Sequence, residues 1–276
     1  MPELPEVQTI INTLKTSGLL HKQITNVSVY KTKLLKNSTL IKFKKFLIGE
    51  SINNITRIGK YLIFHITHNK TLVVHLRMEG KLFYEPASSS ISHIHLRIKF
   101  DLKNHHKLYY YDSRIFGTFH IYEGQEYLNA SHLTKLALDP LDAGFNWKYL
   151  KKHLHDAHRA IKTALLDQTN VSGIGNIYAD EILFLSKINP TKKANLLKDQ
   201  DFKNIAKYSR EVLLKSIKYG GTTIATYKSA ANHIGKFQKK LLVHTKKGEP
   251  CPVCGTKIVK CKVNGRGTYY CPNCQK

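Results

Sequence analysis

Cysteine and acidic residues are scarce in this sequence, and long apolar runs are missing. All five cysteines come after residue 250, so the preceding chain cannot contain a disulfide scaffold. No stretch approaches the roughly 18 consecutive apolar residues of a membrane span. The acidic start MPELPEV differs from a secretory signal, which needs basic residues followed by an apolar run. We therefore expect a protein that is neither secreted nor inserted in a membrane, with reduced cysteines.

The scarcity of acidic residues leaves a large positive charge. Lysine and arginine together number 44 against 19 aspartates and glutamates, which gives a formal net charge of +25. Such an excess predicts a polyanionic partner, nucleic acid above all. The basic residues are spread along the chain, so a proteome rich in lysine is the alternative explanation for much of the excess.

Apolar residues alternate along the first half of the chain, after one helical segment. Pro5 suits the first turn of that helix, and Gly18 suits its end. Alternation begins at Ile24, residues 55–84 are strand-like, and residues 93–100 and 107–123 form another strand pair, with turns predicted at HNK and DLKNHH. Strands with one buried face and short connections predict an antiparallel β-sandwich.

The second half of the chain changes to helical spacing. The segment LDPLDAG resembles a linker. Four helices are predicted after it, over residues 146–154, 158–166, 176–185 and 201–219, and Gly220-Gly221 ends the last one. Residues 228–240 have no clear period and predict a mobile loop. The sequence therefore predicts an α+β protein.

The cysteines at the end of the chain have the spacing of a metal site. Cys251 and Cys254 form one Cys-x-x-Cys pair, and Cys271 and Cys274 form a second. Two such pairs fit one tetrahedral Zn²⁺, whereas a redox dithiol needs only one pair. The remaining Cys261 is predicted to be a small buried residue.

Two glycine-containing segments are candidates for phosphate contacts. Between the zinc pairs, VNGRGTYY predicts a hairpin with Arg266 at its tip, where the side chain either binds a phosphate or is simply solvated. The run SGIGN places two glycines before a helix N-terminus, which attracts anions. Asn176 is there a candidate helix cap and phosphate contact. A tight turn between two helices would have the same sequence.

The opening pair has unusual chemistry. If Met1 is removed, Pro2 presents a free secondary amine beside the Glu3 carboxylate. A terminal amine titrates near 7.7–8.0, so roughly a tenth of it is neutral and nucleophilic at pH 7. An imine formed on proline is a positively charged iminium and therefore an electron sink. This suits attack at a sugar carbon followed by elimination, with Glu3 supplying a proton.

These segments together resemble the formamidopyrimidine-DNA glycosylases, the bacterial repair enzymes for oxidised purines. The motifs that carry the resemblance follow the family order along the whole chain: PELPEV, GKYL with Lys60, HLRMEG with His75 and Met78, DSRIFG with Arg114 and Phe116, GIGNIYADEI, GGTT, GEPCPVCG and GRGTYYCPNCQK. The resemblance implies an N-terminal antiparallel β-sandwich with an N-terminal helix, a helical helix–two-turn–helix domain and a zinc ribbon. We expect these at residues 1–130, 147–245 and 246–276, with a linker at 131–146.

The resemblance also implies a bifunctional DNA glycosylase and AP lyase of base excision repair. Pro2 matches the nucleophile that attacks the anomeric carbon of the flipped-out nucleotide, and Glu3 matches the acid that opens the sugar. Lys60 matches the lysine assigned to β-elimination, and Arg266 matches the arginine assigned to δ-elimination. Taken without the family, Lys60 is one of many lysines, with a surface role as the default.

Three further residues match the wedge that enters the duplex where the base has left. Met78 and Phe116 would fill the hole, and Arg114 would face the orphan cytosine. Ordinary strand core is the alternative for Met78 and Phe116. The neighbouring Ser113 and Ile115 depart from the commoner proline and arginine.

The remaining DNA contacts that the resemblance implies are less local. Asn176 matches a phosphate-binding asparagine and His93 matches a DNA-contacting histidine. His158 stands where some members place a DNA-binding lysine, with Lys162 nearby. Ile224, Ala225, Thr226 and Tyr227 lie where the family's base-recognition loop presents backbone amides.

The expected partner is double-stranded DNA containing 8-oxoguanine or formamidopyrimidines, bound by a monomer in the bacterial cytoplasm with one structural Zn²⁺. One alternative is an endonuclease VIII-like glycosylase acting on oxidised pyrimidines, but that branch usually has glycine in place of Leu4. The other is a catalytically silent zinc-ribbon protein that binds DNA or RNA, which would not need Pro2, Glu3 or Lys60.

Overall fold

The computed structural model describes residues 1–89, 92–103, 105–222 and 235–276. The chain divides into two compact units. The first unit contains Met1–Thr134 and Gly220–Lys236, and the second contains Lys135–Tyr219 and Phe237–Lys276. Within the described residues, no helix combines the length and the apolarity needed to cross a membrane.

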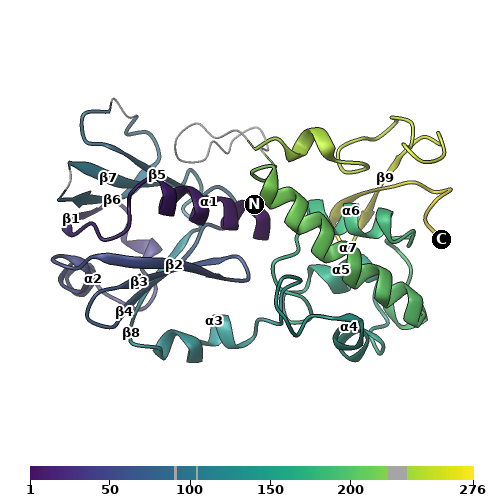
Figure 1. The fold of residues 1–276 in the computed structure, drawn as a ribbon, viewed down its shortest axis with the longest axis horizontal. Helices are drawn as coiled ribbons and strands as arrows, with labels where there is room; N and C mark the ends of the chain where they lie inside the picture. Colours follow the sequence, from purple (N-terminus) through teal and green to yellow (C-terminus); the bar gives the residue numbers. More distant parts are fainter. Residues whose placement is uncertain (90–91, 104, 223–234) are drawn as a thin grey trace. The chain divides into compact units, whose positions relative to one another are not determined.

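The first unit is built on two four-stranded antiparallel sheets (Figure 1). One sheet has the order β1-β6-β7-β5 and the other has the order β2-β3-β4-β8. The strands are β1 (Ile24–Val29), β2 (Ile52–Ile58), β3 (Tyr61–Ile66), β4 (Lys70–His75), β5 (Lys81–Pro86), β6 (Leu96–Leu102), β7 (His106–Tyr111) and β8 (Thr118–Glu123). The predicted β-sandwich is confirmed, and the strands on either side of HNK and of DLKNHH pair with each other as expected.

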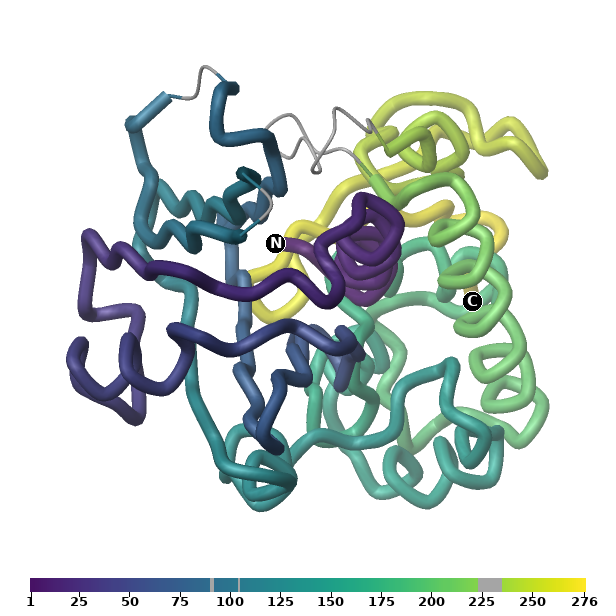
Figure 2. Tube along the Cα trace, turned by 60° about the vertical axis from the view of Figure 1, so that its left-hand side comes forward, coloured from purple at the N-terminus to yellow at the C-terminus, as the bar shows by residue number. Residues whose placement is uncertain are grey.

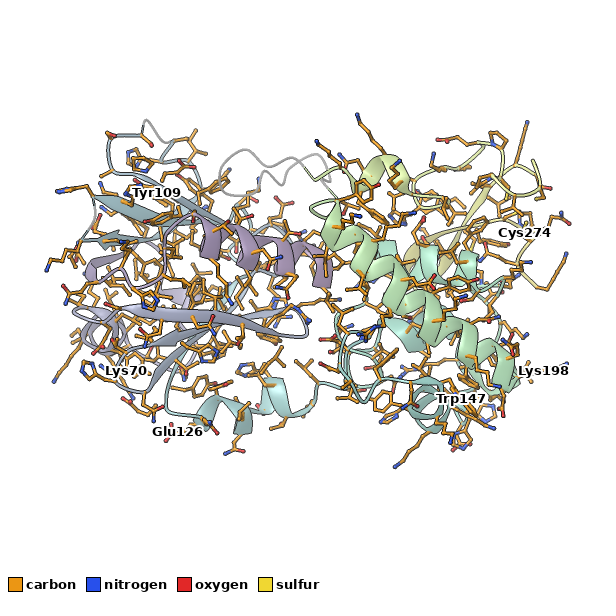
Figure 3. All side chains as sticks on the ribbon, viewed as in Figure 1. Lys70, Tyr109, Glu126, Trp147, Lys198 and Cys274 are labelled. Atoms are coloured by element: carbon orange, nitrogen blue, oxygen red, sulfur yellow. The ribbon has the colours of Figure 1, made fainter. Side chains whose placement is uncertain are left out.

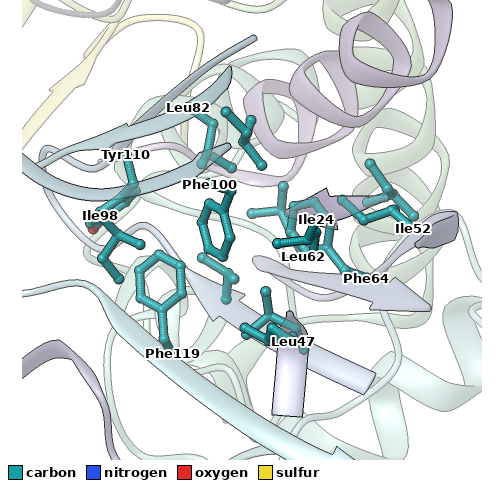
Figure 4. Packing of buried hydrophobic residues seen from close by; sticks show 14 of the residues in the cluster. Ile24, Leu47, Ile52, Leu62, Phe64, Leu82, Ile98, Phe100, Tyr110 and Phe119 are labelled. Atoms are coloured by element: carbon teal, nitrogen blue, oxygen red, sulfur yellow. The ribbon is translucent and has the colours of Figure 1, made fainter. Parts of the chain in front are cut away.

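One apolar core fills the space between the two sheets. Phe100 of β6 and Tyr110 of β7 meet Leu62 and Phe64 of β3 and Phe119 of β8 there (Figure 4). All five side chains are almost fully buried. Alternation along β6, in which every second residue is buried, explains why the pattern could be seen in the sequence.

Helix α1 (Leu4–Thr16) confirms the predicted first helix and packs Val7, Ile10, Ile11 and Leu14 into this core. Glu3 occupies the N-cap position, and Glu6 accepts a hydrogen bond from the Glu3 backbone N–H at 2.9 Å. Gly18 follows the helix with a φ of +84°, a left-handed conformation that glycine adopts without strain. The start of the chain is therefore held by a defined cap.

Helix α2 (Leu40–Leu47) was not predicted. Thr39 caps it by accepting a hydrogen bond from the Lys42 N–H. Phe43 and Leu47 point into the core, while Ile41 is exposed. The three lysines among its eight residues mask the apolar stripe. The first unit also contains η1 (Thr32–Leu34), η2 (Glu126–Asn129) and the short helix α3 (Ser131–Thr134).

The second unit is helical, with a two-stranded ribbon at its end. Its helices are α4 (Trp147–Leu154), α5 (Ile161–Leu166), α6 (Asn176–Leu185) and α7 (Asp199–Lys218), with η3 (Ala194–Leu196) and η5 (Phe237–Lys240); β9 (Val259–Val263) and β10 (Arg266–Tyr270) form the ribbon. All four predicted helices are confirmed. The long helix α7 packs against α4 and α6 (Figure 2).

Within the predicted mobile loop, residues 228–234 lie outside the described residues, and Phe237–Lys240 forms the turn η5. The sole tryptophan of the chain, Trp147, stands at the start of α4 (Figure 3). It therefore belongs to the second unit.

Candidate active site and nucleic-acid interface

The structure divides the predicted site residues into two sets. The first unit contains Pro2, Glu3, Lys60, Met78, His93, Arg114 and Phe116, and the second contains His158, Asn176, Arg266 and the four zinc cysteines. The predicted recognition residues Ile224, Ala225, Thr226 and Tyr227 lie outside the described residues.

The N-terminal pair is held at the start of α1. Pro2 and Glu3 are buried, whereas Met1 is exposed. In the chain with Met1 attached, the Pro2 nitrogen is part of a peptide bond, so the nucleophile requires removal of that exposed residue. Glu6 connects this start to a distant segment, because its Oε1 accepts hydrogen bonds from the N–H and the hydroxyl of Thr222, each at 2.9 Å. Thr222 directly precedes residues 223–234.

Lys60 lies in the turn between β2 and β3 and is 6% exposed. Arg57 ties this turn to α1, since its guanidinium donates to the Gly59 carbonyl at 2.8 Å and to the Gln8 side chain at 3.3 Å. A buried lysine in a turn anchored to the helix that follows Glu3 differs from the surface lysine expected by default. Its placement is consistent with a role in the same site as Pro2 and Glu3.

A cluster of neutral histidines lies beside Lys60. His75, at the end of β4, packs edge-on against Tyr61, with ring centroids 4.4 Å apart. His120 and His132 stack at 4.2 Å. Burial, with the charges of Arg77 and Lys60, lowers the pKa of His75 to about 3. Burial and the neighbouring His132 lower the pKa of His120 to about 4. These rings are therefore uncharged at neutral pH and act as packing groups, and His75 also accepts a hydrogen bond from the Arg77 N–H.

Two loops of the first unit carry the predicted wedge, and we call them the wedge loops. The first connects β4 to β5 (residues 76–80) and carries Met78, which is 40% exposed. The second connects β7 to β8 (residues 112–117) and carries Arg114 and Phe116. Phe116 is 47% exposed, and the Arg114 guanidinium lies over its ring at 4.6 Å. Two large apolar side chains are thus displayed to solvent, which excludes the strand-core alternative.

The residues predicted to contact DNA outside the wedge loops differ in their exposure to solvent. His93 is exposed in the connection between β5 and β6. His158 is exposed, with Nδ1 3.3 Å from the Asn195 amide. Lys162, its predicted neighbour, is completely buried and pairs with Asp180 at 2.7 Å. Lys162 is therefore a structural lysine in this fold.

Asn176 does not cap α6 as predicted, because Gly175 occupies the N-cap position. Asn176 is the first helical residue, and its amide donates to the Gly267 carbonyl at 3.0 Å. The same carbonyl accepts from the Lys162 ammonium at 3.0 Å. The glycine-rich turn and the ribbon of the second unit are thereby joined at Gly267, next to Arg266.

Arg266 is exposed and begins β10. The hairpin tip is formed by Asn264 and Gly265, with φ values of +46° and +73°, rather than by the Gly-Arg-Gly segment that was predicted. Two consecutive left-handed residues are typical of a type I′ turn with an Asn-Gly sequence. Arg266 consequently stands at the first paired position after the tip.

The four predicted zinc ligands come together. The Sγ atoms of Cys251, Cys254, Cys271 and Cys274 all lie within 4.8 Å of one another. Tetrahedral coordination with Zn–S bonds of about 2.3 Å requires S···S separations of about 3.8 Å. The Cys251–Cys274 and Cys254–Cys271 separations are 3.8 and 3.5 Å. The cysteines therefore fit one structural Zn²⁺, and Cys261 lies outside the set.

Several residues at the site carried no assigned role in the sequence analysis. Asp112, the first residue of the second wedge loop, and Tyr110, on the preceding strand, are both buried and are hydrogen-bonded to each other at 3.0 Å. Glu6 and Asp180 are likewise buried carboxylates with backbone or lysine partners. Buried carboxylates are uncommon. Their burial can be predicted from the sequence only where the pattern of neighbouring apolar residues shows that the position faces inward.

Comparisons with known proteins cover almost the whole chain. Three family models match: the formamidopyrimidine-DNA glycosylase N-terminal domain at residues 1–119, the formamidopyrimidine-DNA glycosylase H2TH domain at 136–228, and the zinc finger found in FPG and IleRS at 248–276. The chain is 53% identical to the formamidopyrimidine-DNA glycosylase of Ureaplasma parvum, with 100% of both chains covered. It is 46% identical to that of Mycoplasma genitalium, with 100% of this chain and 96% of the relative covered.

Solved structures give the same result. A Lactococcus lactis FPG mutant in complex with Fapy-dG-containing DNA matches with a TM-score of 0.93 and 36% identity over 100% of both chains. Lactococcus lactis Fpg in complex with abasic-site DNA matches with a TM-score of 0.91 and 36% identity over 99% of both. By sequence over its full length and by fold, this chain belongs to the formamidopyrimidine-DNA glycosylase family.

Proposed function

We propose that this protein is a bifunctional DNA glycosylase and AP lyase of base excision repair that removes oxidised purines from double-stranded DNA. Its membership of the family supports the reaction class. The observation that carries the proposal is the position of Pro2 and Glu3: both are buried directly before α1, in the unit that also holds Lys60 and the wedge loops.

The first chemical step is displacement of the base. The neutral Pro2 amine attacks C1′ of the flipped-out nucleotide, and the bond from C1′ to the base breaks as the base takes up the proton that the Pro2 nitrogen loses. Glu3 donates a proton to the ring oxygen, so that the sugar opens and the nitrogen lone pair forms the iminium. An acid held within the site, 3% exposed, suits such a transfer because few waters compete for its proton.

Strand cleavage follows from the positive charge of the iminium. That charge acidifies the C2′ proton, and its loss expels the 3′-phosphate. A second elimination expels the 5′-phosphate, and hydrolysis then releases the enzyme. We assign the first elimination to Lys60 and the second to Arg266. Both side chains are cationic, which favours the developing negative charge of a departing phosphate.

Binding of the duplex uses the wedge loops and scattered phosphate contacts. Met78 and Phe116 would fill the space left by the flipped nucleotide, and Arg114 would donate to the orphan cytosine. We assign phosphate contacts to His93, His158 and Asn176. A carboxamide has two N–H donors, one of which binds Gly267 in the case of Asn176, so the phosphate would take the other.

The test is borohydride trapping, after intact-mass measurement has established whether Met1 is absent. We expect a covalent complex on duplexes with 8-oxoguanine or formamidopyrimidine opposite cytosine, and a much weaker one on duplexes with oxidised pyrimidines. Stronger trapping on the oxidised pyrimidines would favour the endonuclease VIII-like alternative. An absence of trapping on every damaged duplex by protein lacking Met1 would refute the proposal.

We further propose that the protein acts as a monomer in the bacterial cytoplasm, where its DNA substrate is found. Its functional divisions are the β-sandwich domain at 1–130, the linker at 131–146, the helix–two-turn–helix domain at 147–245 and the zinc ribbon at 246–276. Light scattering after size-exclusion chromatography should give the mass of one chain, with and without a lesion duplex. A mass of two chains would contradict this assignment.

A further inference from the structure

The two wedge loops meet at one buried hydroxyl, that of Tyr110 on β7. A Cβ atom added to Gly80, in the first wedge loop, would lie 2.6 Å from this oxygen. A Cβ added to Gly117, in the second, would lie 1.8 Å from it. Both distances are too short for any side chain, so each glycine leaves the space that the hydroxyl occupies. Tyr110 is 0% exposed and cannot turn away to solvent.

The hydroxyl is fixed by Asp112, which also organises the second wedge loop. Oδ2 of Asp112 accepts from the Tyr110 hydroxyl at 3.0 Å and from the Gly117 N–H at 2.8 Å. Oδ1 accepts from the Arg114 and Ile115 N–H groups, both at 3.0 Å. Asp112 is 1% exposed. One carboxylate therefore receives four donors, three of them from the backbone of the loop that displays Arg114 and Phe116.

The second wedge loop needs such support because its backbone is strained. Ile115 has a φ of +56°, in the left-handed region that a β-branched residue rarely adopts. Hydrogen bonds to a carboxylate are stronger than those between neutral groups, so the bonds to Asp112 can hold the left-handed backbone at Ile115. Asp112 is itself held by its backbone, since its N–H donates to the His95 carbonyl and its carbonyl accepts from the Arg97 guanidinium at 2.8 Å.

The first wedge loop is held by a similar device and is bonded to the second. Its Arg77 has a φ of +55°, and its N–H donates to Nδ1 of the buried His75 at 2.9 Å. The Gly80 N–H donates to the Leu76 carbonyl at 3.0 Å. Across the loops, the Ser113 hydroxyl donates to the Glu79 carboxylate at 3.0 Å.

We propose that Tyr110 and Asp112 are positioning residues that make the two wedge loops a single rigid wedge. Neither side chain reaches solvent, so neither touches the DNA. They act through Met78, Arg114 and Phe116, which they hold at a fixed spacing before the duplex arrives. The inference rests on the proposed function of these three residues. It adds that the position of Met78 on the first wedge loop is coupled to the position of Arg114 on the second.

The test is Tyr110→Phe, which removes one oxygen and keeps the ring in the core. Its matched control is Tyr84→Phe, a buried tyrosine of the same sheet whose hydroxyl donates weakly to the Gly18 carbonyl at 3.4 Å, away from both loops. Three readouts are compared with wild type: single-turnover excision of 8-oxoguanine opposite cytosine, the same opposite adenine, and borohydride trapping on a single strand with an abasic site, which needs no wedge.

We expect Tyr110→Phe to slow excision opposite cytosine about tenfold, the scale of one hydrogen bond to a charged group. The ratio of the excision rate opposite cytosine to the rate opposite adenine should also fall. Trapping on the single strand should stay at the wild-type level, as should all three readouts for Tyr84→Phe. Asp112→Asn keeps the shape of the side chain but points an amide N–H donor at groups that are themselves donors. The second wedge loop should then be displaced, and the excision rate on the duplex should fall about 10²-fold. Because that variant removes more contacts, its melting temperature is measured alongside.

Two results would overturn the inference while wild type remains active. One is an unchanged excision rate and ratio in Tyr110→Phe. The other is an equal loss on the duplexes and on the abasic single strand, because that pattern belongs to a general structural defect. Failure of the proposed function gives a different result, in which the wild-type protein itself shows neither excision nor trapping.

Discussion

Acidification should destabilise the first unit through His75. The ring is 6% exposed, lies against Tyr61 and accepts a hydrogen bond from the Arg77 N–H. A protonated ring would lose this acceptor and place a charge next to Arg77 and Lys60, with His120 and His132 also nearby. Protonation of the folded state is therefore strongly disfavoured, and the first wedge loop depends on the neutral form.

The sign of the effect follows from the direction of the pKa shift. The folded pKa of His75 is about 3, below the value of about 6.5 for an unfolded histidine. Above pH 6.5 both states are neutral, so His75 contributes no pH dependence. As the pH falls below 6.5, the unfolded chain binds a proton that the folded chain does not, and stability is lost until the pH reaches about 3. At pH 5 the loss amounts to about 2 kcal/mol.

The assay is urea denaturation at pH 7.5 and pH 5.0, with wild type compared to His75→Gln. Glutamine does not titrate, so the variant should lose about 2 kcal/mol less than wild type between the two pH values. Circular dichroism is the appropriate signal, because the sole tryptophan, Trp147, stands in the second unit. His21→Gln, at an exposed position of the first unit, is the control and should behave as wild type. Equal losses in wild type and His75→Gln would refute the reasoning.

Four further predictions concern catalysis, the metal and the buried ion pair. Glu3→Gln should bind lesion DNA normally but lose about 10²–10⁴-fold in single-turnover base release; a loss under tenfold would exclude Glu3 as the acid. Cys271→Ala, or removal of zinc by a chelator, should abolish DNA binding and strand cleavage together, because so small a ribbon depends on its metal to fold; full activity of protein shown to be metal-free by elemental analysis would contradict this. Arg114→Ala should narrow the preference for 8-oxoguanine opposite cytosine over adenine, which rests on a contact of about 1–3 kcal/mol, and an unchanged ratio would exclude Arg114 as the reader. Lys162→Met should cost about 3–5 kcal/mol in unfolding free energy by removing the cation beside the buried Asp180 carboxylate, which keeps its contacts with the His244 ring and the Tyr269 N–H; a change below 1 kcal/mol would show that the pair is dispensable.

The sequence predicted those parts of the fold that depend on local pattern. The strand around Phe100 alternates and the strand around Phe64 is an almost continuous apolar run, and the zinc site follows from two short cysteine spacings. Helix α2 was missed because lysines occupy its exposed face and part of its stripe. The hairpin tip lies at Asn264 and Gly265 and not at Arg266, since Asn264 carries the turn signal as well as Gly265.

The contacts that support the site residues could not be predicted from the sequence, for a different reason. Glu6 binds Thr222, and Lys162 binds the Gly267 carbonyl, across long stretches of chain. A single sequence contains no signal for such pairs. Asp112 is close to Arg114 in sequence, but its role depends on a left-handed residue at Ile115 that no local propensity favours. Motif resemblance assigned the proposed catalytic roles, and the structure was needed to find what holds those residues.

The identity of the nucleophile is the central claim, and locating the trapped adduct tests it most directly. Protein lacking Met1 is reacted with an 8-oxoguanine:cytosine duplex in the presence of borohydride, and the covalent complex is digested with nuclease and protease. Tandem mass spectrometry should place the reduced sugar remnant on the nitrogen of Pro2, in the N-terminal peptide. A remnant on the Lys60 side chain, or equal trapping by protein that retains Met1, would contradict the account and assign the chemistry to a lysine.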